Sequence, residues 1–353
     1  MTRIRPRRRR LLWAAAVAVL SVVLLAATGA VILYIRLDGN IAHVDINAAL
    51  GGDRPEDSPN GSQDILVLGS DARPGAGGAH GSPSGEARAD TAMIVHLNED
   101  RDGATLVSIP RDTLVPRPAC QRPDGTTAPP ARAAMFNEAY AIGGPACAVK
   151  TVERFTGVRI DHYIEIDFQG FEKLIDTLGG VDITTREPID DADSHLSLPA
   201  GSHTLDGEQA LALVRTRKAI GDGSDLGRIG LQHEFLRALA EQIGSIGLLA
   251  DPKRLYDLAA AATSAVTTDS QLASVSALTA LGRTLHTIGP DNMRMLTVPV
   301  RYDPADGNRV LPLEPQCAQV WHALRRDEPV PASATRGSAA EEEGTPGVVT
   351  RAR

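Results

Sequence analysis

Short apolar runs bounded by turn-forming residues recur along the middle of the chain. Three of them, at 64–70, 91–97 and 105–109, are rich in branched residues and predict buried β-strands. Residues 98–103, between the second and third runs, are too few for a helical crossover, so these strands should form an antiparallel hairpin. The start of the second strand and the end of the third should then lie at the same end of the sheet.

Further along the chain, stretches with the apolar period of a helix alternate with strand-like runs. This alternation predicts an α/β domain with a mixed central β-sheet flanked by helices. Helices are expected at 145–157, 168–180, from 206 onward, 225–245, 253–266, 270–288 and 315–327, and strands at 162–166, 181–184 and 294–300, with 214–217 extended.

The N-terminus has a different pattern. Residues 1–10 carry six arginines and no acid, and the 25 residues 11–35 carry no charge. A helix of that length, at about 1.5 Å per residue, crosses a hydrocarbon core with some tilt. Arginines favour the cytoplasmic side, so we expect a single-pass cell-membrane protein with a cytoplasmic tail at 1–10, a transmembrane helix at 11–36 and the rest outside. A cleavable signal peptide is the alternative, but its apolar region is usually only about 7–15 residues long.

The composition of the chain after residue 36 predicts a linker, a folded domain and a tail. Residues 37–62 are polar with Gly and Pro, which is typical of a linker, and residues 331–353 have few apolar side chains, which predicts a disordered tail. Residues 63–330 are left as the folded domain. Without residues 1–36 the chain has 29 Lys and Arg against 44 Asp and Glu, a net charge of about −15. Such a surface does not attract nucleic acid, so an anion site needs a local concentration of arginine.

The three cysteines are Cys120, Cys147 and Cys317. Outside the membrane a disulfide is permitted, and Cys120 and Cys147 flank one apparent loop-and-helix segment, so that pair is predicted. The sequence contains no CxxC, no HExxH and no close cluster of His and Cys, which argues against a zinc site.

Acidic and basic side chains gather beside the ends of the three predicted strands. Loops at one edge of an α/β sheet are the usual place for a ligand, and acids among several arginines suggest a divalent cation beside a phosphate. Mg²⁺ needs only one or two protein carboxylates, and arginine offers paired donors that match phosphate oxygens. The alternative is a set of surface ion pairs worth about 0–1 kcal/mol each. The residues are Asp71 and Arg73 after the first strand, Arg88 and Asp90 before the second, and Arg111 and Asp112 after the third.

Two further pairs of side chains could line the same pocket. Arg215 and Arg217 are two apart on the segment expected to be extended, and Arg228 and Gln232 are four apart on a predicted helix. Each pair should therefore share one face of its element. Arg228 and Gln232 are also compatible with the solvated side of an amphipathic helix.

Six segments together resemble the LytR-CpsA-Psr family, which are cell-wall glycopolymer ligases of mostly Gram-positive bacteria. The segments occur in the family's order, cover roughly residues 63–245, and follow an N-terminal anchor of the kind typical of the family. The chain departs from the family in a long Gly-rich loop between Asp71 and Asp90 and in an enlarged segment before "FNEAY". The matching segments are "ILVLGSDAR", "RADTAMIVHL", "LVSIPRDTLV", "FNEAYAIGGPACAVKTVERFTGVRIDHYIEIDFQGFEKLIDTLGGVDI", "LPAGSHTLDGEQALALVRTR" and "DLGRIGLQHEFLRAL".

The resemblance implies an α/β fold that encloses a hydrophobic pocket for a polyprenyl chain, with the pyrophosphate head at an arginine-rich mouth. It implies a phosphotransferase dependent on Mg²⁺ or Mn²⁺, which moves a glycopolymer phosphate from a polyprenyl-pyrophosphate carrier to a peptidoglycan hydroxyl at the plasma membrane. Pyrophosphatase activity would be a side reaction. Asp71 and Asp90 are then the implied metal ligands. The implied pyrophosphate contacts are Arg73, Arg88, Arg111, Arg215, Arg217, Arg228 and Gln232, and the implied catalytic set is Arg88, Arg111, Asp112 and Arg228, with Asp112 either orienting Arg111 or serving as a base.

The main alternative is a non-catalytic module that binds polyprenyl phosphates or wall polymers and regulates envelope assembly. A complete pair of acids favours the enzyme, because a binding module needs only arginines. A transcriptional attenuator, which the family's historical association with gene regulation suggests, is disfavoured. Nothing in the sequence resembles a DNA-reading element, and the expected topology puts the domain outside the cell.

Overall fold

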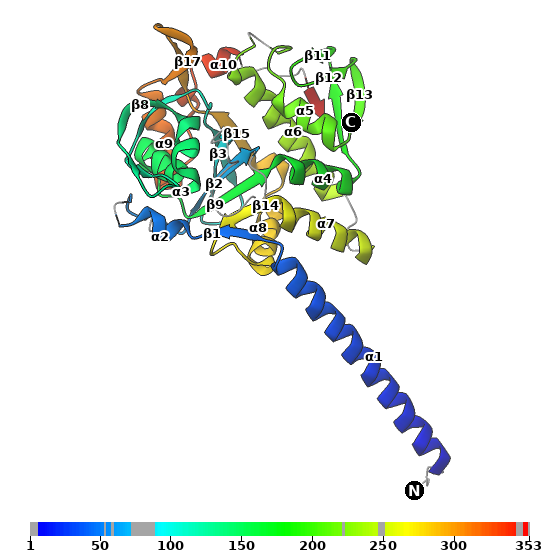
Figure 1. The fold of residues 1–353 in the computed structure, drawn as a ribbon. Helices are drawn as coiled ribbons and strands as arrows, with labels where there is room; N and C mark the ends of the chain where they lie inside the picture. The colour runs from blue at the N-terminus through cyan, green and yellow to red at the C-terminus, as the bar shows by residue number, and fades with distance from the viewer. Residues whose placement is uncertain are drawn as a thin grey trace.

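A mixed seven-stranded β-sheet forms the centre of the computed structural model (Figure 1). Its strand order is β1-β14-β9-β2-β3-β4-β15, with β2 parallel to β9 and antiparallel to β3. β3 and β4 pair antiparallel, which confirms the expected hairpin. The structure describes residues 6–52, 54–57, 60–71, 89–220, 223–245, 251–343 and 349–351. The strands are β1 (Ala42–Val44), β2 (Gln63–Ser70), β3 (Ala89–Leu97), β4 (Ala104–Ser108), β9 (His162–Asp167), β14 (Val266–Asp269) and β15 (Met293–Thr297).

Helices cover both faces of this sheet. On β2, Leu66 and Leu68 join the core beneath α3 and α9, whereas Ile65 and Val67 face α6 and α8, as the alternation of a strand requires. Among the described residues, the core on the α3 side contains 31 buried apolar residues and four partly buried ones. The core on the α6 side contains six buried apolar residues and eight partly buried ones. The α6 side of the sheet is therefore more loosely covered. The helices are α3 (Phe136–Thr156), α6 (Asp225–Ser245), α8 (Val275–Ile288) and α9 (Gln316–Arg326).

A second apolar core lies beside the sheet. Its helices approach closely because of glycine: a Cβ on Gly207 would lie 2.3 Å from the carbonyl oxygen of Glu172, and one on Gly170 would lie 2.5 Å from the Cα of Ala265. The elements of this core, besides α6, are α4 (Phe168–Leu178), α5 (Gly207–Arg215), α7 (Pro252–Ala265), β10 (Val181–Thr185), β11 (Ile189–Asp191), β12 (Leu196–Leu198) and β13 (Gly201–Leu205).

The first helix, α1 (Pro6–Asp38), projects from the domain as one long rod (Figure 1). Its part Trp13–Asp38 is long and apolar enough to cross a membrane, which fits the expected single-pass anchor. The next segment, expected as a linker, is folded: β1 pairs with β14, and α2 (Ile46–Leu50) buries both of its end residues. A few apolar side chains in this polar stretch are enough to add an edge strand and one helical turn to the domain.

The C-terminal segment also differs from the disordered tail that its composition suggested. Ala334 is fully buried and Val349 is 1% exposed. β18 (Val349–Arg351) pairs antiparallel with β10, and α10 (Ala339–Glu343) and the 3₁₀ helix η3 (Ala332–Ala334) precede it. Small side chains suffice here because the segment is packed against an existing core and does not form one of its own.

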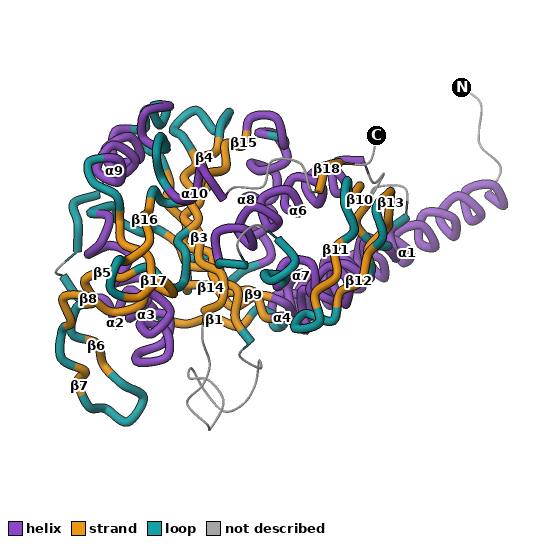
Figure 2. The backbone as a smooth tube through the Cα atoms, turned by 90° about the horizontal axis from the view of Figure 1, so that it is seen from above, coloured by secondary structure: helices purple, strands orange, loops and turns teal. Residues whose placement is uncertain are grey.

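Small hairpins complete the domain on the side of α3 and α9 (Figure 2). One of them, β6 (Cys120–Gln121) with β7 (Thr127–Ala128), carries Cys120, which is bonded to Cys147 with a Cα–Cα distance of 5.5 Å. The predicted disulfide is therefore confirmed, and Cys317 is a buried free thiol. The other two-stranded pairs on this side are β5 (Leu114–Arg117) with β8 (Ala131–Met135), and β16 (Val300–Asp303) with β17 (Asp306–Pro312).

Candidate functional site

Acidic and basic side chains from three segments meet where β3 begins and β4 ends. Arg111 Nη1 lies 2.6 Å from Asp90 Oδ1, as the antiparallel hairpin predicted. Arg228 Nη2, from the first turn of α6, donates to the backbone oxygen of Asp90 at 2.6 Å. The Arg228 side chain is 3% exposed and that of Arg111 is 20% exposed. One arginine is thus fixed inside the protein and the other faces an opening.

Asp225, the first residue of α6, is the shared counter-ion of these arginines. Its Oδ1 lies 2.5 Å from Arg228 Nη2, 3.8 Å from Arg111 Nε and 4.0 Å from Arg217 Nε. Its Oδ2 accepts a hydrogen bond from the backbone N–H of Arg111 at 3.2 Å. The carboxylate is 8% exposed and so holds together three guanidinium groups that would otherwise repel one another.

Burial and neighbouring charges set the protonation of this cluster. Burial lowers the pKa of Arg111, but the carboxylates of Asp225, Asp90 and Asp112 outweigh that effect, and the net pKa is raised. Burial dominates at Arg228 and lowers its pKa, although Asp225 opposes the change. Burial raises the pKa of Asp112, and Asp225 raises it further, against the opposing charge of Arg111. Asp112 is therefore a better proton acceptor near neutral pH than an ordinary aspartate.

Two adjacent cavities open onto the cluster. We call them the arginine pocket, of about 330 Å³, and the hairpin pocket, of about 490 Å³; they share Arg217 and Gly223. The arginine pocket is lined by Asp90, Asp191, Asp193, Ser194, Arg215, Arg217, Lys218, Gly223 and Arg228. The hairpin pocket is lined by Pro110, Arg111, Asp112, Met135, Asn137, Arg217, Gly223, Ser224, Asp225, Leu226, Tyr302, Gly307, Asn308, Arg309 and Val310.

The segment 214–217 enters the arginine pocket as a helix end and not as the extended strand that was expected. Of the two arginines in this segment, Arg215 is the last residue of α5 and Arg217 lies beyond the helix. The guanidinium of Arg215 lies over the ring of Phe168, 5.2 Å from its centroid. The buried carboxylate of Asp191 accepts from the backbone N–H of Arg217 at 2.9 Å and fixes the turn. Both arginines reach the pocket, Arg215 from the end of the helix and Arg217 from the turn after it.

Comparison with known proteins identifies the family. The model of the LytR_cpsA_psr family matches residues 33–326. The chain belongs to this family. The sequence resemblance rested on 63–245, so the family match also takes in the helices and strands after α6.

Relatives within the LytR_cpsA_psr family include cell-wall proteins. The chain is 36% identical to the probable cell wall biosynthesis protein LcpB of Corynebacterium glutamicum over 200 residues. The aligned residues make up 55% of this chain and 45% of LcpB. It is 33% identical over 247 residues to the polyisoprenyl-teichoic acid–peptidoglycan teichoic acid transferase TagT of Bacillus subtilis, covering 66% of this chain and 71% of TagT. The chain spans 45% of LcpB and 59% of the related LcpA.

Solved structures share the fold. A LytR-Csp2A-Psr enzyme from Actinomyces oris matches with a TM-score of 0.58 and 25% identity, over 85% of this chain and 97% of that one. TagT bound to LIIa-WTA matches with a TM-score of 0.56 and 25% identity, over 81% of this chain and 99% of TagT. The mixed sheet flanked by helices is thus the fold of the LytR_cpsA_psr family, as the sequence predicted.

The remaining residues expected from the family occupy different positions. Gln232 is 5% exposed, and its Nε2 donates to Thr91 Oγ1 at 3.1 Å and to the backbone oxygen of Val214 at 2.9 Å. Gln232 therefore joins α6 to β3 and α5 and lines neither cavity. Arg73 and Arg88 lie outside the described residues.

The two acids expected to hold a metal ion come from neighbouring strands. Asp71 is exposed directly after β2, and Asp90 is the second residue of β3; the register pairs Ser70 with Ala89, so the two acids extend from one edge. The described residues contain no group of three or more metal-binding side chains. Two carboxylates with an open side still fit Mg²⁺, which keeps water or substrate oxygens in its other positions.

Sequence reasoning missed three residues that the structure brings to the site: Asp225, Asn137 and Arg309. Asp225 had a detectable signal, since it precedes Arg228 by three residues at the start of a helix, where an acid is favoured. Asn137 lies within the matching segment "FNEAY" but carries no charge. Arg309 comes from a hairpin about 200 residues away from Arg111, and nothing in the sequence links the two.

Proposed function

We propose that the protein is a membrane-anchored phosphotransferase that moves a glycopolymer phosphate from a polyprenyl-pyrophosphate carrier to a peptidoglycan hydroxyl. The observation that carries the proposal is the group of three arginines, Arg111, Arg217 and Arg228, around Asp225 beside an open pocket. The relative TagT is named as a transferase of polyisoprenyl-linked teichoic acid to peptidoglycan, and a site that binds phosphate suits that chemistry.

The arginine pocket suits the pyrophosphate of the donor. Arg215 lines it from the end of α5, Arg217 from the turn that follows, and Arg228 from α6. Arg228 is already immobilised by its contacts to Asp90 and Asp225. Guanidinium groups form paired, charge-assisted hydrogen bonds with phosphate oxygens and remain charged at every relevant pH. Donors that are oriented before the reaction stabilise the charge that develops during phosphoryl transfer without further rearrangement.

The loosely covered side of the sheet suits the lipid chain. Half-buried apolar side chains such as Val67, Val95 and Leu236 lie between the sheet and helices α6 and α8. The membrane helix ends beside the same layer, because Asp38 Oδ1 accepts from the backbone N–H of Val275, the first residue of α8. The proposed orientation has the arginine-rich N-terminus in the cytoplasm and the domain outside. Anchoring then raises the local concentration of a lipid-linked donor.

Asp71 and Asp90 would hold the Mg²⁺ or Mn²⁺ ion. The ion, when bound, supplies positive charge to the phosphate oxygens and lowers the energy of the transition state. Asp90 Oδ1 faces Arg111 at 2.6 Å, so this carboxylate would be positioned by Arg111 as it binds.

The chain's own residues would then direct the transfer. The acceptor hydroxyl oxygen forms a bond to the phosphorus next to the glycan, and the bond from that phosphorus to the bridging oxygen breaks. The polyprenyl phosphate leaves, and the proton of the hydroxyl goes to the carboxylate of Asp112, whose pKa is raised by burial. Arg111 stabilises the negative charge on the transferring group. Water in place of the sugar hydroxyl would give the side pyrophosphatase reaction.

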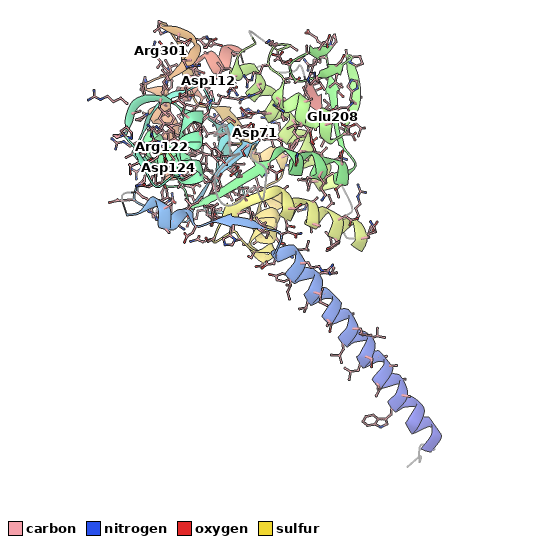
Figure 3. All side chains as sticks on the ribbon, in the orientation of Figure 1. Asp71, Asp112, Arg122, Asp124, Glu208 and Arg301 are labelled. Carbon is pink, nitrogen blue, oxygen red and sulfur yellow. A yellow bond between two sulfur atoms is a disulfide. The ribbon has the colours of Figure 1, made fainter. Side chains whose placement is uncertain are left out.

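The proposal is tested with the full chain in detergent and a short prenyl pyrophosphate. We expect release of phosphate that requires Mg²⁺ or Mn²⁺ and falls by about 100-fold or more in Arg111→Ala and in Asp90→Ala. The first variant loses the positive charge beside the transferring phosphate, and the second loses a proposed ligand of the metal ion. Arg122→Ala is the matched control, since this exposed arginine lies on the β6–β7 hairpin (Figure 3). A wild-type protein that binds the lipid but releases nothing, even with peptidoglycan added, would be a binding module.

A further inference from the structure

The proposed function leaves open where the acceptor binds, and the hairpin pocket offers a place for it. The pocket lies next to the arginine pocket and shares Arg217 with it, so a ligand there would adjoin a pyrophosphate in its neighbour. Its volume of about 490 Å³ is within the range of roughly 300–1,000 Å³ that is usual for small-ligand sites. Residues of the β16–β17 hairpin line one side of the pocket. This hairpin (Figure 2) lies outside the segments within 63–245 that carry the sequence resemblance to the family.

Asn137 indicates what kind of ligand group the pocket can bind. The residue is 5% exposed and lines the pocket, and its Oδ1 has no hydrogen-bond partner among the residues that the structure describes. A buried acceptor without a donor costs about 1–3 kcal/mol. The amide oxygen can only accept, so an ionised phosphate, which also only accepts, cannot satisfy it. A sugar hydroxyl or an acetamido N–H can donate to it.

The hairpin adds groups suited to a sugar ring. Tyr302 presents a half-buried aromatic side chain, and Asn308 and Arg309 present polar ones. Arg309 Nη1 lies 4.0 Å from Asp112 Oδ1, and Asp112 also lies 3.6 Å from Arg111 Nε. Asp112 therefore lies between Arg309 of the hairpin and Arg111, whose other partner, Asp90, lines the arginine pocket. A hydroxyl bound against Asp112 would face the donor phosphorus.

We infer that the hairpin pocket binds the acceptor sugar, with a hydroxyl or acetamido group donating to Asn137 Oδ1 and the ring held by Tyr302 and Arg309. This inference rests on the proposed function for the identity of the donor. The reacting hydroxyl gives its proton to Asp112 as its oxygen bonds to phosphorus, and the polyprenyl phosphate departs on the opposite side. Specificity for the acceptor thus resides in a hairpin separate from the arginine pocket.

The test compares Michaelis constants for donor and acceptor in the full chain, with a soluble peptidoglycan glycan-chain fragment as the acceptor probe. We expect Asn137→Ala and Arg309→Gln each to raise the acceptor KM by about five- to tenfold, in line with the loss of one hydrogen bond, with a donor KM that changes by less than twofold. Arg301→Gln is the matched control, because this exposed arginine is on the same hairpin but does not line the pocket (Figure 3). Thermal midpoints check that each variant folds.

Equilibrium binding of the same fragment without donor separates this inference from the proposed function. Binding by the wild type that weakens in Asn137→Ala and Arg309→Gln supports the acceptor site, even if no transfer is observed and the proposed function fails. No binding by the wild type, or equal binding by wild type and both variants, overturns the inference. Donor and acceptor KM rising together would also overturn it, because the pocket would then belong to the donor site.

Discussion

Replacing Asp225 by Asn removes the charge that holds three arginines together, and its effect on stability follows from the burial of each pair. Arg228 and Asp225 are 3% and 8% exposed, so their ion pair is buried, and breaking such a pair typically costs about 3–5 kcal/mol. Arg111 and Arg217 are 20% and 33% exposed and lie 3.8 and 4.0 Å away, so each adds only about 0–1 kcal/mol. The buried pair dominates, so we expect a loss of at least about 3–5 kcal/mol at neutral pH.

Thermal unfolding of the full chain in detergent measures this loss. At about 2 °C per kcal/mol for a domain of this size, the midpoint of Asp225→Asn should fall by about 6–10 °C. Asp193→Asn is the control, since Asp193 lines the arginine pocket and its ion pair among the described residues is with the exposed Lys218. Its midpoint should stay within about 1 °C of wild type.

The same thermal unfolding experiment, repeated with added inorganic pyrophosphate, tests whether these arginines bind the anion. In Asp225→Asn the arginines lack their internal anion, so an added anion should bind more tightly and raise the midpoint further than it does in the wild type. An unchanged midpoint for Asp225→Asn would refute the idea that Asp225 is the counter-ion. Equal stabilisation of both proteins by pyrophosphate would refute the idea that these arginines bind it.

Two further predictions concern the body of the domain. The double variant Cys120→Ser/Cys147→Ser should lose about 3–4 kcal/mol of stability, because the disulfide closes a loop with a sequence separation of 27. Denaturant unfolding of the variant and of the oxidised wild type measures this loss. An unchanged unfolding midpoint would contradict it. Burial, together with Arg237, lowers the pKa of His233 to about 4, below its value of about 6.5 in the unfolded chain. The stability that its neutral form provides is therefore present above about pH 6.5 and is lost, by at most about 3 kcal/mol, as the pH falls to about 4. His233→Gln should flatten this part of the stability profile, and an identical profile would contradict the assignment.

Much of this architecture could be predicted because it is local. The hairpin of β3 and β4 followed from a connection of six residues, and it correctly brought Asp90 beside Arg111. Helix α6 has the bounds that its amphipathic pattern predicted. Such features depend on hydrophobic period and loop length, which a single sequence contains.

Features that depend on packing between distant segments could not be predicted in the same way. β1 and β18 are short strands in polar stretches and form only because a core is already present to receive them. Arg215 was expected on an extended segment, but the capping box of Asp206 and Gln209 starts a helix that continues to Arg215. Arg309 reaches Asp112 only through the tertiary fold.

Stoichiometry of transfer tests the central proposal most directly. The full chain is incubated with a polyprenyl-pyrophosphate-linked glycan and a peptidoglycan acceptor, and mass spectrometry quantifies both products. We predict one polyprenyl phosphate released for each glycan joined to the acceptor through a phosphodiester, with both products lost in Arg111→Ala. Donor that is bound but never transferred, or polyprenyl phosphate released with no glycan on the acceptor, would contradict it.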